Sequence, residues 1–438
     1  MKYLIRTFGC QMNQHDSQFI AAMLDALGGV PVEDADTADI IIVNTCSVRE
    51  SAENKILGFI DSLKRIKRDH PALTVVVCGC MVSKKEQIEK ILRKRPHIDI
   101  ILGTRSLYRL PHFLEQKEKE RGPFIEFDLS ADIPEGREHL REESFRAYLT
   151  IMYGCDNFCS YCIVPYVRGR EKSREKREII AEAKRLVNDG VKEIMLLGQN
   201  VNSYGKGLDH PASFADLLYE LNEIDGLERI RYMTSHPKDF SEEIIDAIAA
   251  SKKVCRHFHL PFQSGSDRIL KEMNRHYQRD DYLDLLEKIK AGFPEGVLTT
   301  DIIVGFPGEG EEDFEDTLDL LRRIEFDNAY TFLFSPRSGT PAARSAEQIS
   351  DDVKRERLTR LMDLQNAISL KKNEAMVGRE IILLGEGRSK TNPNTQSGRT
   401  DGNKLVHFAA GRDYAGEMVK VRIEEAHTWS LNGRLIEK

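Results

Sequence analysis

Six short β-rich runs lie between Phe145 and Ser335, and helical patterns separate each run from the next. The runs are Tyr148–Met152, Glu193–Leu197, Ile230–Met233, His257–Leu260, Leu298–Val304 and Ala329–Phe334. Repeated β/α units of this kind predict parallel strands with helical crossovers, and six of them indicate a partial (β/α)6 barrel. Such barrels gather their chemistry at the carboxyl ends of the strands. The pattern therefore limits where functional residues can lie.

The segments on either side of this region predict two further domains. Residues 1–114 contain three β-rich runs with amphipathic stretches between them, which is typical of a parallel α/β domain of the Rossmann or flavodoxin type. Residues 115–144 are mostly charged and are predicted to be a linker, and residues 145–373 form the central domain. Residues 374–438 are strand-rich with Gly and Asn turns, which predicts a small β-barrel.

The chain contains eight cysteines, and their expected role depends on the cellular compartment of the protein. No run of about 18 apolar residues occurs, and the N-terminus lacks the apolar core of a signal peptide, so a cytoplasmic protein without membrane contact is expected. Because the cytosol keeps thiols reduced, these cysteines are expected to be metal ligands or reactive thiols rather than disulfides.

Three cysteines follow the first of the six β-rich runs directly. Cys155, Cys159 and Cys162 form the pattern C-x3-C-x2-C. A four-iron cluster normally takes four cysteines, so three leave one iron open. An open iron can chelate the amino and carboxylate groups of S-adenosylmethionine and pass an electron to its sulfonium, which produces a 5′-deoxyadenosyl radical. Two alternatives are three unrelated cysteines in one loop and a zinc site completed by a distant His.

A second set of three cysteines is spread through the N-terminal segment. Cys10, Cys46 and Cys80 each come directly after a predicted strand. Parallel sheets bind ligands at the carboxyl ends of their strands, so these thiols should emerge at one edge. Cys78 and Cys255 fit better as buried, structural residues. Spacing alone leaves open whether Cys78 can replace Cys80.

Polar or small residues follow several of the barrel strands. Taken singly, each is more often a cap or a turn residue than a ligand, but they converge on the end of the barrel where an adenosylated ligand would bind. The candidate contacts are Gln199, Asn200, Ser235, Gln263, Ser264 and Asp301.

The cysteine motif resembles that of the radical S-adenosylmethionine superfamily, which has these spacings and an aromatic residue, here Tyr161, before the last cysteine. Tyr161 therefore joins the candidate cofactor contacts. Over nearly its whole length the chain resembles the methylthiotransferases, and four segments look like their tRNA branch: Thr7–Asn13, Val43–Val48, Ile163–Gly169 and Leu197–Tyr204. Asp156 and the extra thiol of Cys78 depart from the pattern, and neither removes a ligand.

The resemblance implies two [4Fe-4S] clusters, an auxiliary one on Cys10, Cys46 and Cys80 and another on Cys155, Cys159 and Cys162. It implies that a methylthio group is transferred to C2 of an N6-dimethylallyladenosine next to the anticodon, with two S-adenosylmethionine molecules per turnover. No catalytic residue beyond the cluster ligands is assigned.

The resemblance also implies partners: the tRNA anticodon stem-loop, an electron donor such as flavodoxin or ferredoxin, and a sulfur donor or iron–sulfur assembly proteins. A monomer is expected. Two rivals remain. One is a sibling enzyme that acts on threonylcarbamoyl adenosine or on a ribosomal-protein aspartate, and the other is a non-catalytic, metal-clamped RNA-binding protein.

RNA binding by this chain needs local basic patches, because the net charge is -7. Arg168 and Arg170 belong to one such patch. The C-terminal segment resembles the TRAM domain, a β-barrel that binds RNA, and its turn contributes Arg399 and Lys404. Among its aromatic residues, Phe408 is expected in the core, whereas Tyr414 and Trp429 are available for stacking.

Overall fold

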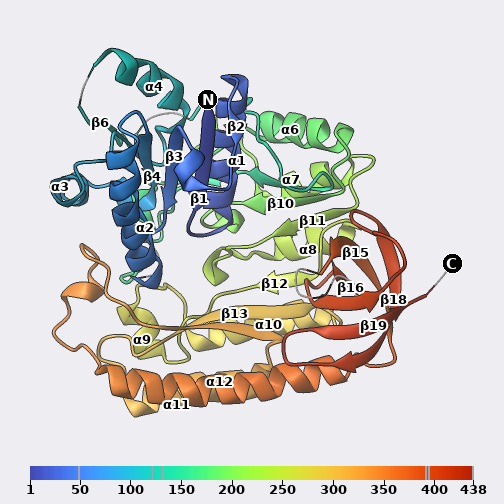
Figure 1. Cartoon of the computed structure of the whole chain (residues 1–438). Helices are drawn as coiled ribbons and strands as arrows, with labels where there is room; N and C mark the ends of the chain where they lie inside the picture. Colours follow the sequence, from blue (N-terminus) through green and yellow to red (C-terminus); the bar gives the residue numbers. More distant parts are fainter. Residues whose placement is uncertain (48–49, 121, 131–132, 390–391, 393–394, 437–438) are drawn as a thin grey trace.

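The computed structural model of the chain describes residues 1–47, 50–120, 122–130, 133–389, 392 and 395–436. Its three parts are an N-terminal sheet domain, a central domain of parallel strands and helices, and a C-terminal closed barrel (Figure 1). The N-terminal domain and the closed barrel pack against different sides of the central domain (Figure 1). Within the described residues, no helix is both long and apolar enough to cross a membrane.

The N-terminal domain is a six-stranded parallel sheet in the order β2-β1-β3-β4-β5-β6. Its strands are β1 (Lys2–Thr7), β2 (Val30–Pro31), β3 (Ile40–Thr45), β4 (Thr74–Gly79), β5 (Ile100–Leu102) and β6 (Phe124–Glu126). Its helices are α1 (Gln11–Ala26), η1 (Ala35–Thr37), α2 (Glu50–Asp69), η2 (Cys80–Val82), α3 (Lys85–Lys94), η3 (Leu107–Arg109) and α4 (Leu110–Lys119). Apolar residues of α1 and α4 pack on one face, and those of α2 and α3 pack on the other. This is the doubly wound arrangement expected from the sequence.

The predicted linker begins too early. Helix α4 continues to Lys119, and β6 adds a sixth strand by pairing Ile100 of β5 with Phe124. The sequence hides this strand because it is only three residues long and lies among charged residues. The chain that follows packs on α1, where the His139 ring stacks on His15 with centroids 3.9 Å apart.

The central domain contains all six predicted barrel strands in sequence order. They form two parallel sheets, β7-β10-β11 and β12-β13-β14, which meet at a bridge between Ile230 and Val254. The strands of the domain are β7 (Arg146–Thr150), β8 (Met152–Tyr153), β9 (Lys172–Ser173), β10 (Glu193–Leu197), β11 (Arg229–Tyr232), β12 (His257–His259), β13 (Val297–Val304) and β14 (Asn328–Leu333). One extended apolar core fills the space between these strands and their helices.

Helices cover the outside of this open barrel (Figure 1). They are α5 (Val164–Val167), α6 (Lys176–Asn188), η4 (Val201–Ser203), α7 (Phe214–Asn222), η5 (Pro237–Asp239), α8 (Glu242–Ala250), α9 (Asp267–Glu272), α10 (Arg279–Gly292), α11 (Glu311–Ile324), η6 (Ala342–Arg344) and α12 (Asp351–Glu374). The long helix α12 crosses the central domain and leads directly into the C-terminal barrel (Figure 1).

The C-terminal segment forms a closed barrel in the order β15-β16-β17-β19-β18. Its strands are β15 (Glu380–Arg388), β16 (Thr395–Arg399), β17 (Leu405–Ala409), β18 (Met418–Ala426) and β19 (Leu431–Leu435). Strands β16 and β19 were not predicted, because their sequences are mostly polar and each contains a glycine. Phe408 lies in the barrel core with 1% of its surface exposed, which confirms its predicted place.

A buried charge cluster fixes this barrel to the first residues of the central strands. The Glu193 carboxylate lies 2.7 Å from both Arg146 and Arg231. Arg231 also donates to the carbonyl oxygens of Thr400 and Asp401 in the C-terminal barrel, at 2.7 and 2.8 Å. Burial alone would raise the pKa of Glu193, but the two guanidinium groups hold it below its usual value.

We expect Arg231→Met to lower the free energy of unfolding by about 3 kcal/mol, since removal of one partner leaves a buried carboxylate with less compensation. Because the folded-state pKa of Glu193 is depressed, its pairing stabilises the fold above the unfolded pKa of about 4.3, and this stabilisation is lost as pH falls. The difference in unfolding temperature between variant and wild type should therefore shrink below about pH 4. Thermal unfolding at several pH values measures this, and a difference that grows in acid would contradict it.

Candidate active site

Three thiols meet at the carboxyl edge of the N-terminal sheet. Cys10 follows β1, Cys46 follows β3 and Cys80 follows β4, and these strands are direct neighbours. Cys46 and Cys80 are buried, whereas Cys10 is exposed at the start of α1. Burial raises the pKa of Cys80 to about 11, and the thiols of Cys46 and Cys10 add to that rise. The structure thus brings together the three cysteines that the sequence singles out.

Two glycines with left-handed backbone conformation allow close packing at this edge. Gly9 has a φ of +136°, and a Cβ there would lie 2.6 Å from Asn13 Oδ1 and 3.0 Å from the Cβ of Cys46. Gly79 has a φ of +96°, and its Cβ would lie 2.4 Å from the carbonyl oxygen of Thr45. A side chain at either position would collide with these atoms, so glycine lets the strand ends approach one another closely. The soft thiol donors that this approach brings to one edge fit an iron–sulfur cluster.

Cys78 faces a different environment from Cys80. Cys78 is fully buried in the apolar core beneath α1 and α4, together with Phe19 and Leu102. Cys80 instead contacts Ile163 and Val167 of the central domain. The positive φ of Gly79 turns the chain between the two cysteines. This placement favours Cys80 over Cys78 as a ligand, which stays a prediction.

The central cysteines lie in the loop between β8 and α5. Cys155 and Cys159 are buried and Cys162 is half-buried, and the Cys162 amide donates to the Cys159 carbonyl oxygen at 2.9 Å. Burial raises the pKa of Cys155 to about 11 and that of Cys162 to about 12. Both thiols therefore keep their protons at neutral pH, and iron binding would release them.

The described residues contain no group of three His, Cys, Asp or Glu side chains arranged to hold a single metal ion. A tetrahedral zinc site takes four ligands that converge on one ion, with sulfur about 2.3 Å from it. A four-iron cluster is wider than one ion, so its thiolate ligands do not have to converge on a single point.

Arg275 connects the cysteine loop to the rest of the barrel. Its guanidinium lies 3.5 Å from Cys159 Sγ and 3.4 Å from the hydroxyl of Tyr161, and it donates to the Pro261 carbonyl oxygen at 2.7 Å. Arg275 was not predicted from the sequence, because it lies on a helix-to-helix turn far from the cysteines in sequence. A buried guanidinium can donate charge-assisted hydrogen bonds to the sulfur of a cluster ligand.

Buried polar atoms without a hydrogen-bond partner gather after three barrel strands. Among the described residues they include both amide atoms of Asn202, Ser235 Oγ, His236 Nε2 and Gln263 Oε1. These residues follow β10, β11 and β12 at the carboxyl ends. An unpaired buried polar group costs about 1–3 kcal/mol, so such a cluster indicates where a polar ligand binds. Ser235 and Gln263 were predicted, whereas Asn202 and His236 were not.

Other predicted cofactor contacts already have protein partners. The Asn200 side-chain nitrogen donates to Asp239 at 2.7 Å, and its side-chain oxygen accepts from the His236 backbone amide at 3.1 Å. Ser264 Oγ accepts from the Ser266 backbone amide at 3.3 Å. Asp301 lies 3.6 Å from His259 and keeps 28% of its side chain exposed. Asp301 can therefore still reach a ligand, whereas Asn200 and Ser264 support their loops.

Gln199 lies apart from these residues. It lines a small cavity between the N-terminal and central domains, together with Met12, Arg137 and Arg168. Gln199 does not belong to the group of residues with unpaired polar atoms after β10, β11 and β12.

The four predicted RNA contacts differ in exposure. Arg170 has 73% of its side chain exposed beside Asp156, at 2.7 Å. Arg168 is only 6% exposed and donates to Asp16 at 3.1 Å, so it presents no surface to RNA.

The other two predicted RNA contacts lie in the C-terminal domain. Lys404 is 13% exposed and lies 2.8 Å from Asp327, which fixes the C-terminal barrel to the central domain. Arg399 is 34% exposed and lies 3.3 Å from Glu386.

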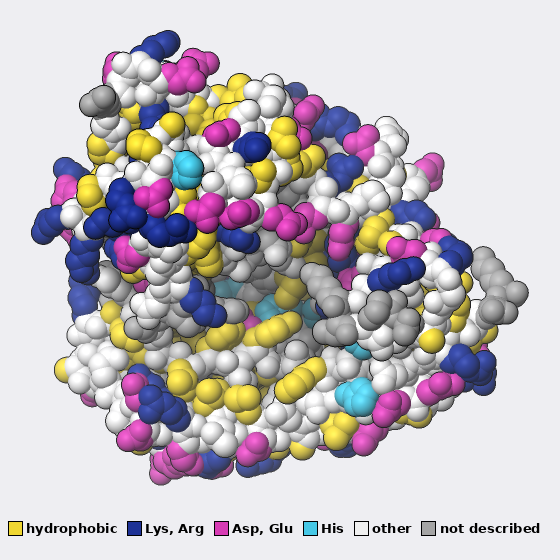
Figure 2. Space-filling view, in the orientation of Figure 1, with side chains coloured by type: hydrophobic (Ala, Val, Ile, Leu, Met, Phe, Trp, Pro, Cys, Tyr) yellow, Lys and Arg dark blue, Asp and Glu magenta, His cyan; other side chains and the backbone are white. Residues whose placement is uncertain are grey.

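Trp429 is the most exposed large apolar side chain among the described residues, at 72%. It borders a cavity of about 110 Å³ between the C-terminal barrel and β14, together with Tyr330 and Arg399. Figure 2 shows a hollow in the middle of the molecule whose visible walls carry hydrophobic and His side chains, with Lys and Arg side chains gathered at its left. Local basic surface thus exists despite the overall negative charge.

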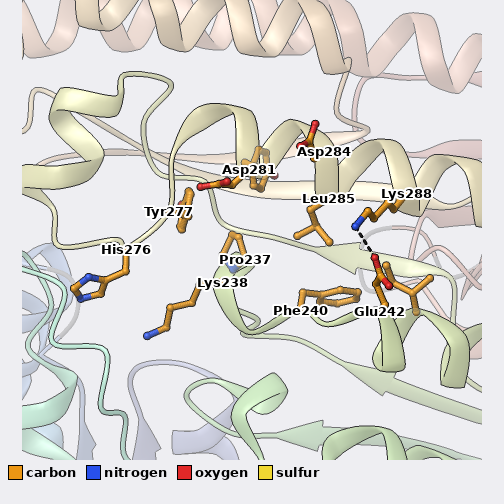
Figure 3. Close-up of a pocket in the computed structure, with 12 residues that line it drawn as sticks. Pro237, Lys238, Phe240, Glu242, His276, Tyr277, Asp281, Asp284, Leu285 and Lys288 are labelled. Carbon is orange, nitrogen blue, oxygen red and sulfur yellow. Dashed lines mark hydrogen bonds and ion pairs between the residues drawn. The ribbon is translucent and has the colours of Figure 1, made fainter.

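A second cleft of about 410 Å³ lies outside the barrel, between η5–α8 and α10 (Figure 3). His276 and Lys238 lie at one end of it, and an ion pair between Lys288 and Glu242 at 2.6 Å lies at the other (Figure 3). None of the sequence-predicted site residues lines this cleft. Its charged residues are of both signs, so it does not define a ligand.

Comparison with known families agrees with the three-part architecture. The profile of the radical SAM superfamily matches residues 149–321, that of the uncharacterized protein family UPF0004 matches residues 2–103, and that of the TRAM domain matches residues 374–436. In the solved structures, the radical S-adenosylmethionine methyltransferase TsrM from Kitasatospora setae superposes with a TM-score of 0.57. It covers 84% of this chain and 89% of its own, at 14% identity, so it supports the fold alone.

Curated relatives match the chain from end to end. The tRNA-2-methylthio-N(6)-dimethylallyladenosine synthase of Alkaliphilus oremlandii is 52% identical over 100% of this chain and 93% of its own length. The synthase of the same name from Acetivibrio thermocellus is 49% identical over 99% of this chain and 91% of its own length. Identity at this level over all three domains shows that the chain belongs to the radical S-adenosylmethionine methylthiotransferase family, among the tRNA-2-methylthio-N(6)-dimethylallyladenosine synthases.

Proposed function

We propose that this protein transfers a methylthio group to C2 of N6-dimethylallyladenosine in tRNA, and that it does so with two [4Fe-4S] clusters. The observation that carries the proposal is the presence of two three-thiol sites on one chain, each at the carboxyl ends of parallel strands. The full-length relatives supply the substrate class. A tRNA substrate is consistent with work in the cytoplasm, and a monomer stays the expectation for this chain.

An aromatic C2–H bond is too strong and too weakly acidic for a side-chain base. The cluster that Cys155, Cys159 and Cys162 would hold would supply the one-electron chemistry that cleaves S-adenosylmethionine and makes removal of this hydrogen possible. The chain's own residues position the reactants. The unpaired polar atoms of Asn202, Ser235, His236 and Gln263 would bind the polar groups of S-adenosylmethionine, and Arg275 holds Cys159 in place.

The three N-terminal thiols would have a different role from the three central thiols. Cys10, Cys46 and Cys80 would hold the auxiliary cluster, which supplies the sulfur that becomes the methylthio group. An external electron donor such as flavodoxin or ferredoxin, and a sulfur donor or iron–sulfur assembly proteins, complete the proposed set of partners. The C-terminal barrel would hold the anticodon stem-loop, since small β-barrels bind looped nucleic acid through one face.

The experiment that tests the proposal compares three tRNAs with reconstituted enzyme under reductant. Burial of the five-carbon prenyl group offers up to about 0.8 kcal/mol per carbon over bare adenosine. A threonylcarbamoyl group brings a carboxylate, whose burial without a paired cation costs more than that. Prenylated tRNA should therefore react, unmodified tRNA should react much more slowly, and threonylcarbamoylated tRNA should not react. Mass analysis of the nucleosides measures this, and comparable product from the last substrate would move the protein to the sibling group.

We expect Trp429 to stack on an unpaired RNA base. Base–aromatic stacking is worth about 1–3 kcal/mol, so Trp429→Ala should weaken tRNA binding about tenfold, and Trp429→Phe should keep most of the affinity. Because Trp429 is the only tryptophan in the chain, its fluorescence reports the contact directly and should be quenched on titration with tRNA. Unchanged fluorescence at saturating tRNA would refute this role.

A further inference from the structure

Arg168 belongs to the central domain, but its side chain lies among residues of the N-terminal domain. It follows α5, and only 6% of the residue is exposed. Its guanidinium lies 3.1 Å from Asp16 Oδ2 and 3.5 Å from Asn13 Oδ1, both on α1. The same Asn13 oxygen accepts from Cys10 Sγ at 3.3 Å. Val167, the residue before Arg168, packs in one apolar cluster with Cys80.

The backbone around Arg168 is held from both sides. Thr104 Oγ1 donates to the Val167 carbonyl oxygen at 3.2 Å, and Arg105 Nε donates to the Arg168 carbonyl oxygen at 3.4 Å. On the other side, the Gly169 carbonyl oxygen accepts from the Cys155 amide at 3.3 Å. A segment of three residues thus contacts both cysteine sites, with the Arg168 side chain directed to one of them.

Burial of the Arg168 guanidinium does not by itself stabilise the fold. The ion pair with Asp16 must recover the cost of removing two charges from water, and well-packed apolar residues are often equally stable in such positions. A guanidinium is, however, well suited to donate several hydrogen bonds at once to anionic sulfur and oxygen. The position therefore suits an anionic group on the thiol side of Arg168.

We propose that Arg168 is a positioning residue of the N-terminal iron–sulfur site, where its buried positive charge, held beside the thiols by Asn13 and Asp16, makes the cluster easier to reduce. The inference rests on the proposed function, since it requires a cluster on Cys10, Cys46 and Cys80. Net charge and hydrogen bonds to the sulfurs set the reduction potential of such clusters. Reduction adds negative charge, and the buried guanidinium stabilises the more negative state.

The test uses the full chain with Cys155, Cys159 and Cys162 all replaced by alanine, so that only the N-terminal cluster is loaded. Its midpoint potential is measured by reductive titration followed by electron paramagnetic resonance. Arg168→Gln should reduce the equilibrium constant for one-electron reduction at least tenfold, which is about 59 mV toward negative potential. Arg170→Gln, at the exposed arginine two residues on, is the matched control and should leave the potential unchanged.

A second variant tests the inference if Arg168→Gln does not bind an iron–sulfur cluster. Asp16→Asn removes the negative partner and leaves the guanidinium, so the potential should move in the positive direction. An unchanged potential in whichever of these variants loads iron overturns the inference. Absence of any iron–sulfur signal from the parent triple variant would instead refute the auxiliary cluster, and with it both the proposed function and this inference.

Discussion

Replacing Cys159 with alanine is expected to abolish the reductive cleavage of S-adenosylmethionine. The variant keeps two of the three central thiols and loses the sulfur that Arg275 contacts at 3.5 Å. Loss of a residue outside the ligand set of a metal site typically costs about 10–100-fold, so loss of a ligand should exceed that range. The same result is expected for Cys155 and Cys162. The measurement is 5′-deoxyadenosine released by reconstituted protein under a strong reductant.

The matched control for this prediction is Cys255→Ala. Cys255 is also buried, but it lies beside Arg231 and Asp401 at the junction with the C-terminal barrel. Its loss should leave cleavage unchanged, because it is not part of either three-thiol site. Cleavage at a near-native rate by any of the three central variants would contradict the assignment of that cysteine.

Replacing Cys80 with alanine is expected to separate the two halves of the reaction. Cleavage of S-adenosylmethionine should continue, since Cys155, Cys159 and Cys162 are intact, but methylthiolated tRNA should fall below detection because the N-terminal cluster would lose a ligand. Both products are measured in one assay by mass analysis. The ratio of 5′-deoxyadenosine to methylthiolated tRNA should therefore be much higher for Cys80→Ala than for the wild type.

Cys78→Ala is the control here, since Cys78 lies two residues away in the apolar core. It should keep its product and lose about 1 kcal/mol of stability, as is usual for a small truncation in a core. Full product from Cys80→Ala would show that Cys78 replaces it or that the ligand was assigned to the wrong thiol.

The barrel strands were predictable from sequence because burial and periodicity determine them locally. The run from Glu193 to Leu197 forms β10 with the predicted bounds, and all five of its residues are buried. Strand β6 was missed because three half-buried or exposed residues carry little pattern. It becomes a strand only because the edge of β5 is available for pairing, which is a tertiary effect.

The roles of charged residues were harder to predict. Arg168 and Lys404 looked like RNA contacts because a basic side chain in a loop is usually exposed. Their partners, Asp16 and Asp327, lie far away in sequence, so no local pattern reveals that either charge is paired and buried. The unpaired atoms of Asn202 and His236 had a weak signal, since both follow a predicted strand in a polar loop. Only the packed structure distinguishes them from Asn200, whose amide is already paired.

The C-terminal barrel is attached at the amino ends of the central strands, through Arg229, Arg231 and Arg256, whereas the cysteines lie beyond the carboxyl ends. The longest central strand, β13, has eight residues, which at about 3.3 Å per residue is roughly 26 Å. At the rise of a DNA strand, about 3.4 Å per nucleotide, an extended and stacked nucleic acid would need about eight nucleotides to contact both ends. If both ends bind the same tRNA, free nucleosides and very short oligonucleotides are expected to be poor substrates, because they cannot contact both.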